Sequence, residues 1–139
     1  MTETTLPARC VVVVDQALPP GLAANATAVL ALSIGARFPQ LPGHDPVDAD
    51  GFAHAGLIPM GLPVLSAPGD RLTALRAAAI DAGLTVIDFP TVGQQTTDYD
   101  AFAAAVLGTP SAELTYLGIA LCGSNRPVRK LTGGFPLLR

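Results

Sequence analysis

Hydrophobic and polar residues along the chain form two kinds of pattern. Short runs of aliphatic, often β-branched residues are typical of buried strands, and they predict strands at Cys10–Val14, Leu62–Ser66, Leu84–Phe89 and Leu114–Leu121. Segments of helix-forming residues predict helices at Gly21–Ala36, Arg71–Ala82, Asp98–Leu107 and Asn125–Leu131. Because strands and helices alternate, we predict a single α/β domain over residues 1–139, with residues 1–8 as a flexible tail.

The sheet of this domain is expected to be small and to lie between two layers of helices. Helices that connect successive strands cover both faces of a sheet, which predicts a three-layer αβα sandwich. The short, turn-rich middle of the chain indicates a mixed, mostly parallel sheet rather than a wholly parallel one. At the helix starts, Pro20 suits a first turn, and Asp70 and Thr97 are the expected N-caps.

The region from residue 39 to residue 68 is rich in proline and glycine and has no helical pattern. Its Asp50-Gly51 pair is a turn signal that would join two short strands, Pro46–Ala49 and Phe52–Ala55. Acidic and histidine side chains gather in this region, namely His44, Asp45, Asp48, Asp50 and His54. Such residues can converge on a metal ion, but the ligands that would complete a calcium loop are missing. We therefore interpret the cluster as a solvated hairpin and expect no metal site.

The composition indicates a folded domain with few charges on its surface. Half of the residues are hydrophobic, only 14% are charged, and the net charge is −3. Disordered chains have the opposite balance, so disorder is excluded. Because few charges are present to coat a monomer, we expect a homo-oligomer, with a dimer favoured. The alternative is a monomer coated by Thr, Ser, Gln and Asn.

Cysteine usage and the lengths of the apolar runs indicate the compartment. Cys10 and Cys122 lack a CxxC spacing and are too few for a disulfide framework, which favours reduced thiols in a cytoplasmic protein. The run Val11–Val14 is too short for the core of a signal peptide. The uncharged stretch after Pro20 is too short to cross a bilayer, so we expect no membrane segment.

Basic residues are concentrated near the C-terminus. The net charge of −3 argues against an overall basic nucleic-acid binder. However, Arg126, Arg129 and Lys130 form a basic patch in a stretch that has no acidic residue from position 121 to position 139. Contact with phosphate, and hence with nucleic acid, or with the carboxylates of a partner therefore remains open. The alternative is a solvated helix face.

Polar residues near the ends of two predicted strands indicate a candidate ligand-binding cleft. Asp15 follows the first strand, and Asp88 lies at the end of the strand Leu84–Phe89. If these strands are parallel neighbours, both carboxylates would lie beside the first helix, near Gly21 and Asn25. A helix N-terminus also offers free N–H groups to an anion. The alternative is that Asp15 and Asp88 cap loops and that Asn25 bonds to backbone.

Motifs that would identify a cofactor or a common catalytic mechanism are missing. The chain has no GxxxxGK[ST], GxGxxG, GxSxG or HExxH segment. These absences argue against NTPase, dinucleotide, serine hydrolase and zinc protease chemistry. We expect no cofactor and interpret the partner of the cleft as a small molecule.

Several segments resemble a known family when taken together. They are Val11-Val-Val-Val-Asp15, Leu18-Pro-Pro-Gly-Leu-Ala-Ala-Asn25, Leu117-Gly-Ile-Ala-Leu-Cys-Gly123, Lys130-Leu-Thr-Gly133 and Leu137-Leu138. From about residue 8 to residue 139, the chain is similar to a bacterial family of unknown function in the type II peptidyl-tRNA hydrolase superfamily, the archaeal and eukaryotic kind. The resemblance implies that the predicted αβα sandwich is hydrolase-like.

The hydrolases themselves differ from this chain at functional positions. They carry Gly-Lys-x-Ala-Ala-Gln at the start of the first helix and a His three residues later; here Gly21 replaces the Lys, Asn25 the Gln and Ala28 the His. An Asp after a strand in the hydrolases matches Asp88 by position. Since a cation that stabilises charge contributes strongly to such catalysis, we expect small-ligand binding without the hydrolase activity.

Two alternatives to small-ligand binding remain. In the first, the protein is a residual hydrolase of peptidyl- or aminoacyl-tRNA. Asp88 would then act as the acid or base, and Asn25 with helix N–H groups would stabilise the oxyanion. In the second, the protein is a non-catalytic interaction protein.

Overall fold

Strands and helices alternate along the chain as the sequence predicts. The structure is a computed structural model that describes residues 5–139. The elements, in order, are β1 (Arg9–Asp15), α1 (Pro20–Arg37), β2 (Val64–Ala67), α2 (Gly69–Asp81), β3 (Thr85–Pro90), η1 (Thr91–Gly93), α3 (Tyr99–Leu107), η2 (Ser111–Glu113), β4 (Tyr116–Gly123) and α4 (Asn125–Thr132). All four predicted strands and all four predicted helices are present, with shifts of a few residues at their ends.

The four strands form one mixed sheet in the order β2-β1-β4-β3. β1 pairs with β2 in parallel, whereas β4 is antiparallel to both β1 and β3. The prediction of a mixed sheet is confirmed, but its mostly parallel pairing is wrong, because only β1 and β2 pair in parallel. β1, β2 and β3 nevertheless all run in the same direction. The reason lies between β3 and β4, where the N–H of Thr91 bonds to the carbonyl of Thr115 at 2.9 Å. The chain between them makes an excursion through α3 and returns antiparallel to the same end of the sheet.

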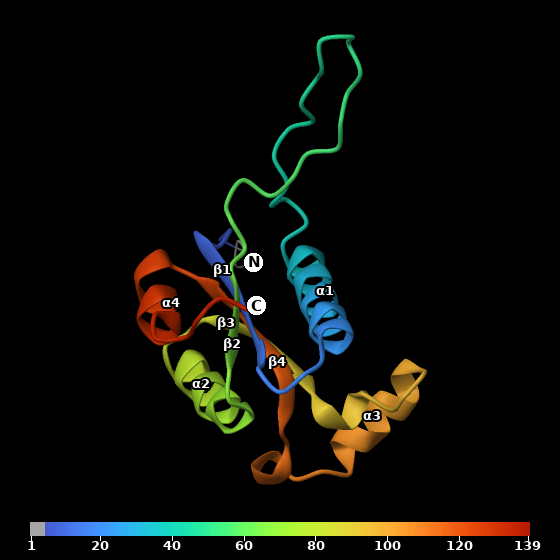
Figure 1. Ribbon diagram of the computed structural model, residues 1–139, viewed down its shortest axis with the longest axis vertical. Helices are drawn as coiled ribbons and strands as arrows, with labels where there is room; N and C mark the ends of the chain where they lie inside the picture. Colours follow the sequence, from blue (N-terminus) through green and yellow to red (C-terminus); the bar gives the residue numbers. More distant parts are fainter. Residues whose placement is uncertain (1–4) are drawn as a thin grey trace.

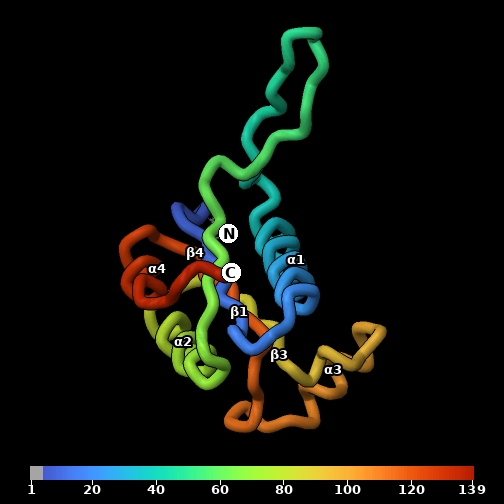
Figure 2. Tube along the Cα trace, viewed as in Figure 1, coloured from blue at the N-terminus to red at the C-terminus, as the bar shows by residue number. Residues whose placement is uncertain are grey.

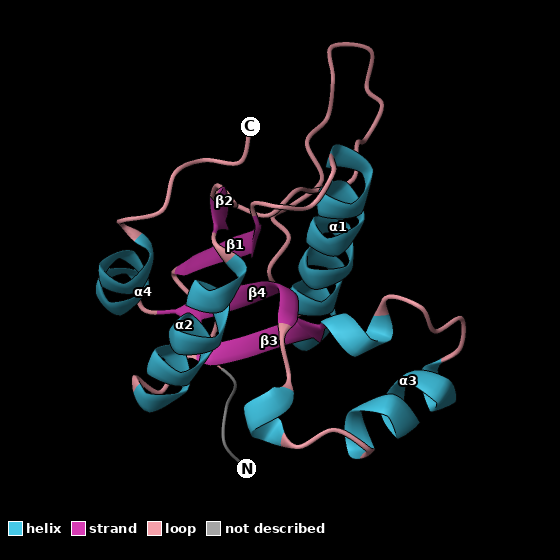
Figure 3. Ribbon diagram, turned by 60° about the horizontal axis from the view of Figure 1, so that its bottom comes forward, coloured by secondary structure: helices cyan, strands magenta, loops and turns pink. Residues whose placement is uncertain are grey.

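Helices cover the two faces of the sheet with separate hydrophobic cores (Figures 1 and 3). Side chains alternate between the faces of a strand. In β1, Val12 and Val14 pack in the core under α1, while Val11 and Val13 pack in the core under α2 and α4. All four valines are fully buried, which identifies β1 as a central strand buried on both faces. The expected three layers are therefore present.

The helices begin at residues that differ slightly from the predicted caps. The N-cap of α2 is Pro68, while the expected cap, Asp70, lies in the first turn where its charge favours the helix dipole. In α3 the cap is Asp98 rather than Thr97, and its carboxylate accepts a hydrogen bond from the N–H of Ala101 at 2.8 Å. Among the described residues, no helix is both long and apolar enough to span a membrane.

The two edges of the sheet are different. The outer edge of β2 is covered by the C-terminal segment, because Ser66 N–H donates to the carbonyl of Pro136 and Leu138 N–H donates to the carbonyl of Val64, each at 2.9 Å. At the other edge, β3 is half-buried rather than fully buried, although its apolar sequence predicts a buried strand. At the start of the chain, residues 1–4 lie outside the described part. The predicted flexible tail is nevertheless tied down at its end, where Ala8 N–H bonds to Gly123.

A long hairpin projects from the domain between α1 and β2 (Figures 1 and 2). We call residues 43–57 the arm; its base is closed by a hydrogen bond of 2.8 Å from Gly43 N–H to the carbonyl of Leu57. The two short strands predicted here reduce to one antiparallel bridge, Val47 to Ala53. The predicted turn is present, with Gly51 at a φ of 87°. An unpartnered hairpin gains little from regular pairing, which explains the short ladder.

Gly118 in β4 provides a test of how tightly this sheet packs against α1. A Cβ at Gly118 would lie 3.0 Å from Leu30 Cδ1 and 3.1 Å from the carbonyl oxygen of Val13. We expect Gly118→Ala to lower the free energy of unfolding by about 1–3 kcal/mol, because overpacking displaces α1. As a control, Gly35→Ala in α1 adds a Cβ with nothing within 4 Å, and should raise stability by about 0.5–1 kcal/mol. Urea titration measures both, and equal effects would contradict tight packing at Gly118.

Candidate functional site

The residues of the predicted cleft lie on opposite faces of the sheet. β4 separates β1 from β3, so the strands that carry Asp15 and Asp88 are not neighbours. Asp15 lies beside the start of α2, with its Oδ2 2.9 Å from the position that a Cβ on Gly69 would occupy, and its Oδ1 accepts from Ala17 N–H at 2.9 Å. Gly21 and Asn25 lie on α1, which covers the other face, and both are exposed. The structure therefore does not bring the four residues together.

Asp88 belongs to a half-buried polar cluster under α2. Its Oδ2 accepts a hydrogen bond of 2.7 Å from Nε of Arg76, and the Arg76 guanidinium lies 5.5 Å from the centre of the Tyr116 ring. The hydrogen bond with Asp88 raises the pKa of Arg76, and burial raises the pKa of Tyr116. Each group thus has a partner within the fold. The arrangement links α2 to the edge strand β3 and engages one oxygen of the Asp88 carboxylate with a cation.

A cavity lies on the opposite face, between α1, the edge strand β3 and α3. Figure 3 shows α3 at the margin of the sheet. The cavity has a volume of about 450 Å³. Its aromatic wall consists of Phe89, Tyr99 and Phe102, and the rings of Tyr99 and Phe102 meet edge to face with centroids 5.5 Å apart. Gly93 makes room for these rings, since a Cβ there would lie 2.7 Å from Phe102. Asp88 also borders this cavity.

Several polar groups that line the cavity are hydrogen-bonded within the protein, but one charged side chain has no partner among the described residues. Ser33 and Thr96 donate their hydroxyl protons to the carbonyls of Val29 and Gly93, and Asp98 caps α3. Arg37, in the last turn of α1, lies at the cavity wall, and no other described residue holds its guanidinium by a hydrogen bond or an ion pair. Beside the bonded carboxylates of Asp88 and Asp98, the cavity therefore presents aromatic rings for an apolar body and one cation for an anionic group.

Sequence reasoning did not find this cavity, but one signal was present. Three of the seven aromatic residues of the chain, Phe89, Tyr99 and Phe102, occur within one polar, glutamine- and threonine-rich stretch. Phe89 lies in β3, and Tyr99 and Phe102 lie on the short helix α3, so three rings around a polar segment were a sign of a surface or a pocket. Arg37 carried no such signal, because it lies far from this stretch in the sequence although it lines the same cavity.

A second cavity lies at the opposite end of the sheet and reaches Cys122. Its volume is about 420 Å³, and Phe38, Leu84 and Cys122 are among the residues that line it. Cys10 and Cys122 face one another across β1 and β4 and are free and buried. A hydrogen bond that the Cys122 thiol donates to Cys10, together with burial, raises the pKa of Cys122. The neutral, buried thiol of Cys122, which is the one that lines this cavity, is therefore a poor nucleophile.

The predicted basic patch is exposed on α4. Arg126, Arg129 and Lys130 are spaced by three and four residues, which places them on one face of the helix, opposite buried Val128. Only Arg129 has a side-chain partner among the described residues, because its Nε donates to Asn125 Oδ1 at 2.9 Å. The patch lies on the α2 side of the sheet, and none of its residues borders the cavity at Arg37.

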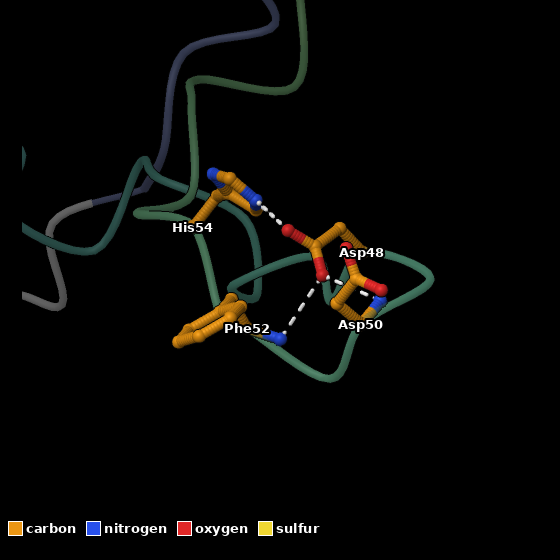
Figure 4. Close-up of polar contacts among 4 residues, drawn as sticks. All are labelled: Asp48, Asp50, Phe52 and His54. Carbon is orange, nitrogen blue, oxygen red and sulfur yellow. Dashed lines mark hydrogen bonds and ion pairs between the residues drawn. The ribbon is translucent and has the colours of Figure 1, made fainter.

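The acidic and histidine residues of the arm form a hydrogen-bonded turn (Figure 4). Oδ1 of Asp48 accepts from the N–H groups of Asp50 and Phe52, at 2.9 and 3.1 Å, and its Oδ2 lies 2.9 Å from Nε2 of His54. Asp45 accepts from Gly56 N–H across the arm at 2.8 Å. Within residues 5–139, no three His, Cys, Asp or Glu side chains are placed to hold a metal ion. The carboxylates of Asp45 and Asp48 therefore stabilise the backbone of the arm by accepting hydrogen bonds.

A double-mutant cycle tests how much the Arg76–Asp88 pair stabilises the fold. The two side chains are 34% and 26% exposed, so water screens their interaction. We expect Asp88→Asn and Arg76→Met to have a coupling energy of about 0.5–1 kcal/mol in urea titrations. Asp81→Asn, at an exposed carboxylate without a partner, should change stability by less than about 0.5 kcal/mol. Strictly additive effects would show that the pair does not stabilise the fold.

The turn of the arm should respond to acid through Asp48. The bond with His54 and then the N–H of Phe52 lower the pKa of Asp48, so the ordered turn favours the ionised form. The stability that the ionised Asp48 gives to the turn is fully present above the ordinary aspartate pKa of about 3.9. It is lost as the pH falls through the lower pKa that Asp48 has in the folded turn. We expect the amide NMR signals of Asp50 and Phe52 to shift with a midpoint below the ordinary value. Asp48→Asn should abolish the transition; a midpoint at or above the ordinary value would contradict it.

Comparisons with known proteins agree with the fold and assign no activity. The solved structure of the protein Atu0240 of Agrobacterium tumefaciens strain C58, described as a protein of unknown function, is similar with a TM-score of 0.84 and 19% sequence identity, over 93% of this chain and 96% of that one. No curated protein matches the chain. The family described as "Protein of unknown function (DUF2000)" matches residues 8–139. The chain therefore belongs to the DUF2000 family.

Proposed function

We propose that this protein binds a small molecule that has an aromatic or other apolar body and a carboxylate, in the cavity between α1, β3 and α3. The observation that carries the proposal is the position of Arg37, a cation without a partner among the described residues, at the wall of an aromatic cavity. The volume of about 450 Å³ is within the range of pockets that hold small ligands.

Each wall of the cavity has a distinct role in this proposal. The rings of Phe89, Tyr99 and Phe102 would stack against the apolar body of the ligand. The guanidinium of Arg37 would form a charge-assisted pair with its carboxylate. Ser33 and Thr96 use their hydroxyl protons within the protein, so their oxygens remain available as acceptors for a donor group of the ligand.

The fold is proposed to be hydrolase-like without the hydrolase reaction. This rests on the resemblance to the type II peptidyl-tRNA hydrolases. In this chain, Gly21 and Asn25 stand where the hydrolases have a Lys and a Gln. Two observations weigh against residual hydrolysis at Asp88 and Asn25. The Asp88 carboxylate is bonded to Arg76, and Asn25 belongs to the helix on the other face of the sheet. The ligand-binding cavity therefore replaces the predicted cleft in our proposal.

Thermal shift with matched acid and amide probes tests the proposal. At a hundredfold excess over its dissociation constant, a ligand adds about 2.7 kcal/mol of stability. For a domain of this size, that raises the melting temperature by several degrees. We expect 3-phenylpropanoate to raise the melting temperature more than 3-phenylpropanamide. Arg37→Met should weaken binding of the acid by about tenfold or more and leave the amide unaffected, because only the acid offers a charge to the guanidinium.

Two further variants separate the cavity from general effects. Phe102→Ala should weaken both probes, since it removes part of the aromatic wall. Arg71→Met, at an exposed arginine on the α2 face, should change neither. Failure of every carboxylate probe to shift the melt would overturn the proposal. Release of peptide from peptidyl-tRNA, lost in Asp88→Asn, would instead favour the hydrolase alternative.

A further inference from the structure

The arm exposes apolar side chains on a preformed scaffold. Val47, Phe52 and Leu57 are 64%, 70% and 82% exposed. Hydrogen bonds across the arm nevertheless fix its shape, including His54 N–H to the carbonyl of Pro46 at 2.8 Å and Asp48 N–H to the carbonyl of Phe52 at 2.9 Å. A segment that is already ordered loses little conformational freedom on binding. An ordered projection with exposed apolar residues is typical of an interaction surface.

Acidic and basic residues are concentrated in different parts of the chain, and this distribution indicates a partner for the arm. No Lys or Arg occurs between Arg37 and Arg71, and the arm carries the carboxylates of Asp45, Asp48 and Asp50. Conversely, no acidic residue follows Glu113, and that part of the chain contains the basic patch of α4. Within one molecule, the arm points away from the domain and leaves α4 uncovered (Figure 1).

From this complementarity we propose that a second copy of this chain is the partner, with the arm of each copy lying on α4 of the other. The three carboxylates of the arm face Arg126, Arg129 and Lys130 of the second copy. With the two copies related by a two-fold axis, each arm contacts α4 of the other copy, and two equivalent contacts hold the dimer together. The apolar residues of the arm meet the C-terminal segment of that copy, which follows α4 and exposes Leu137.

Other occupants of the arm fit less well. Two arms placed against each other would bring like charges together, which disfavours arm-to-arm contact. The outer face of α1 exposes Leu22, Val29 and Leu32, but Arg37 is the one cation on that helix. Only the basic patch offers several cations on one helix face to an arm with three carboxylates.

Charge-exchange variants test the proposal without disturbing either fold. In the arm, Asp45→Asn and Asp48→Asn keep the oxygens that accept the hydrogen bonds of the turn, and Ala49→Lys with Asp50→Lys make the arm basic. In α4, Arg126→Glu, Arg129→Glu and Lys130→Glu make the patch acidic. Each variant alone would pair like charges, whereas an equimolar mixture of the two restores opposite charges at both contacts.

Sedimentation and native mass spectrometry of the full chain measure the outcome. We expect a wild-type dimer at about 10 μM, weakened by high salt. Each charge variant should dissociate at least about tenfold more readily, and their mixture should form the heterodimer. Phe52→Ser should also weaken the dimer without lowering the melting temperature of the monomer, because this ring is exposed.

A matched control and the contrary outcomes complete the test. Asp81→Lys with Asp100→Lys makes a similar charge change on α2 and α3 and should leave the dimer intact. The proposal is overturned by a monomeric wild type, by charge variants that remain dimeric, or by a mixture that stays monomeric. A monomer that binds a polyanion through Arg126, Arg129 and Lys130 would assign the patch to nucleic acid instead.

Discussion

Burial of β1 and β4 on both faces is the constraint on which the rest of this structure depends. Every residue from Cys10 to Val14 is buried, and so is every residue from Tyr116 to Cys122. Two central strands without a polar face require a helical layer on each side. α1 supplies one layer, and α2 with α4 supplies the other. What remains, α3 and the arm, lies outside these layers and provides the surfaces at which we place ligand and partner.

The two faces of the sheet differ in how their polar groups are satisfied. Under α2, the carboxylate of Asp88 and the guanidinium of Arg76 hold one another, so the edge of the sheet is fastened on that side. On the α1 side, the same edge borders an aromatic cavity with the unpaired Arg37. Both faces hold a hydrophobic core, and we place the proposed ligand on the α1 side of this edge. The separation of the predicted cleft residues follows from the same division.

The sequence predicts the elements of the fold better than their arrangement. The run Val11–Val14 and the stretch from Leu117 to Leu121 are long apolar segments, and local composition is enough to identify them as central strands. The sequence predicts β3 as a buried strand, whereas the structure shows it half-buried at an edge of the sheet. The polar residue Asp88 within its apolar run was a sign of this edge position. Strand order, by contrast, depends on contacts between distant segments, such as the Thr91–Thr115 bond that returns β4 antiparallel to β3. The sequence does not indicate the candidate site for the same reason, because Arg37 and Phe102 line one cavity only in the folded chain.

The order of the strands in the chain has a consequence for synthesis on the ribosome. β4 is a central strand of the sheet, yet it is the last strand to be made. Until residues 116–123 have emerged, the four valines of β1 lack their antiparallel neighbour, and the core under α1 lacks Leu117 and Ala120. Apolar strands that wait for a distant partner fold slowly and are prone to aggregate. The nascent protein therefore completes its sheet only after residue 123 has emerged, and its valine strand is exposed to aggregation until then.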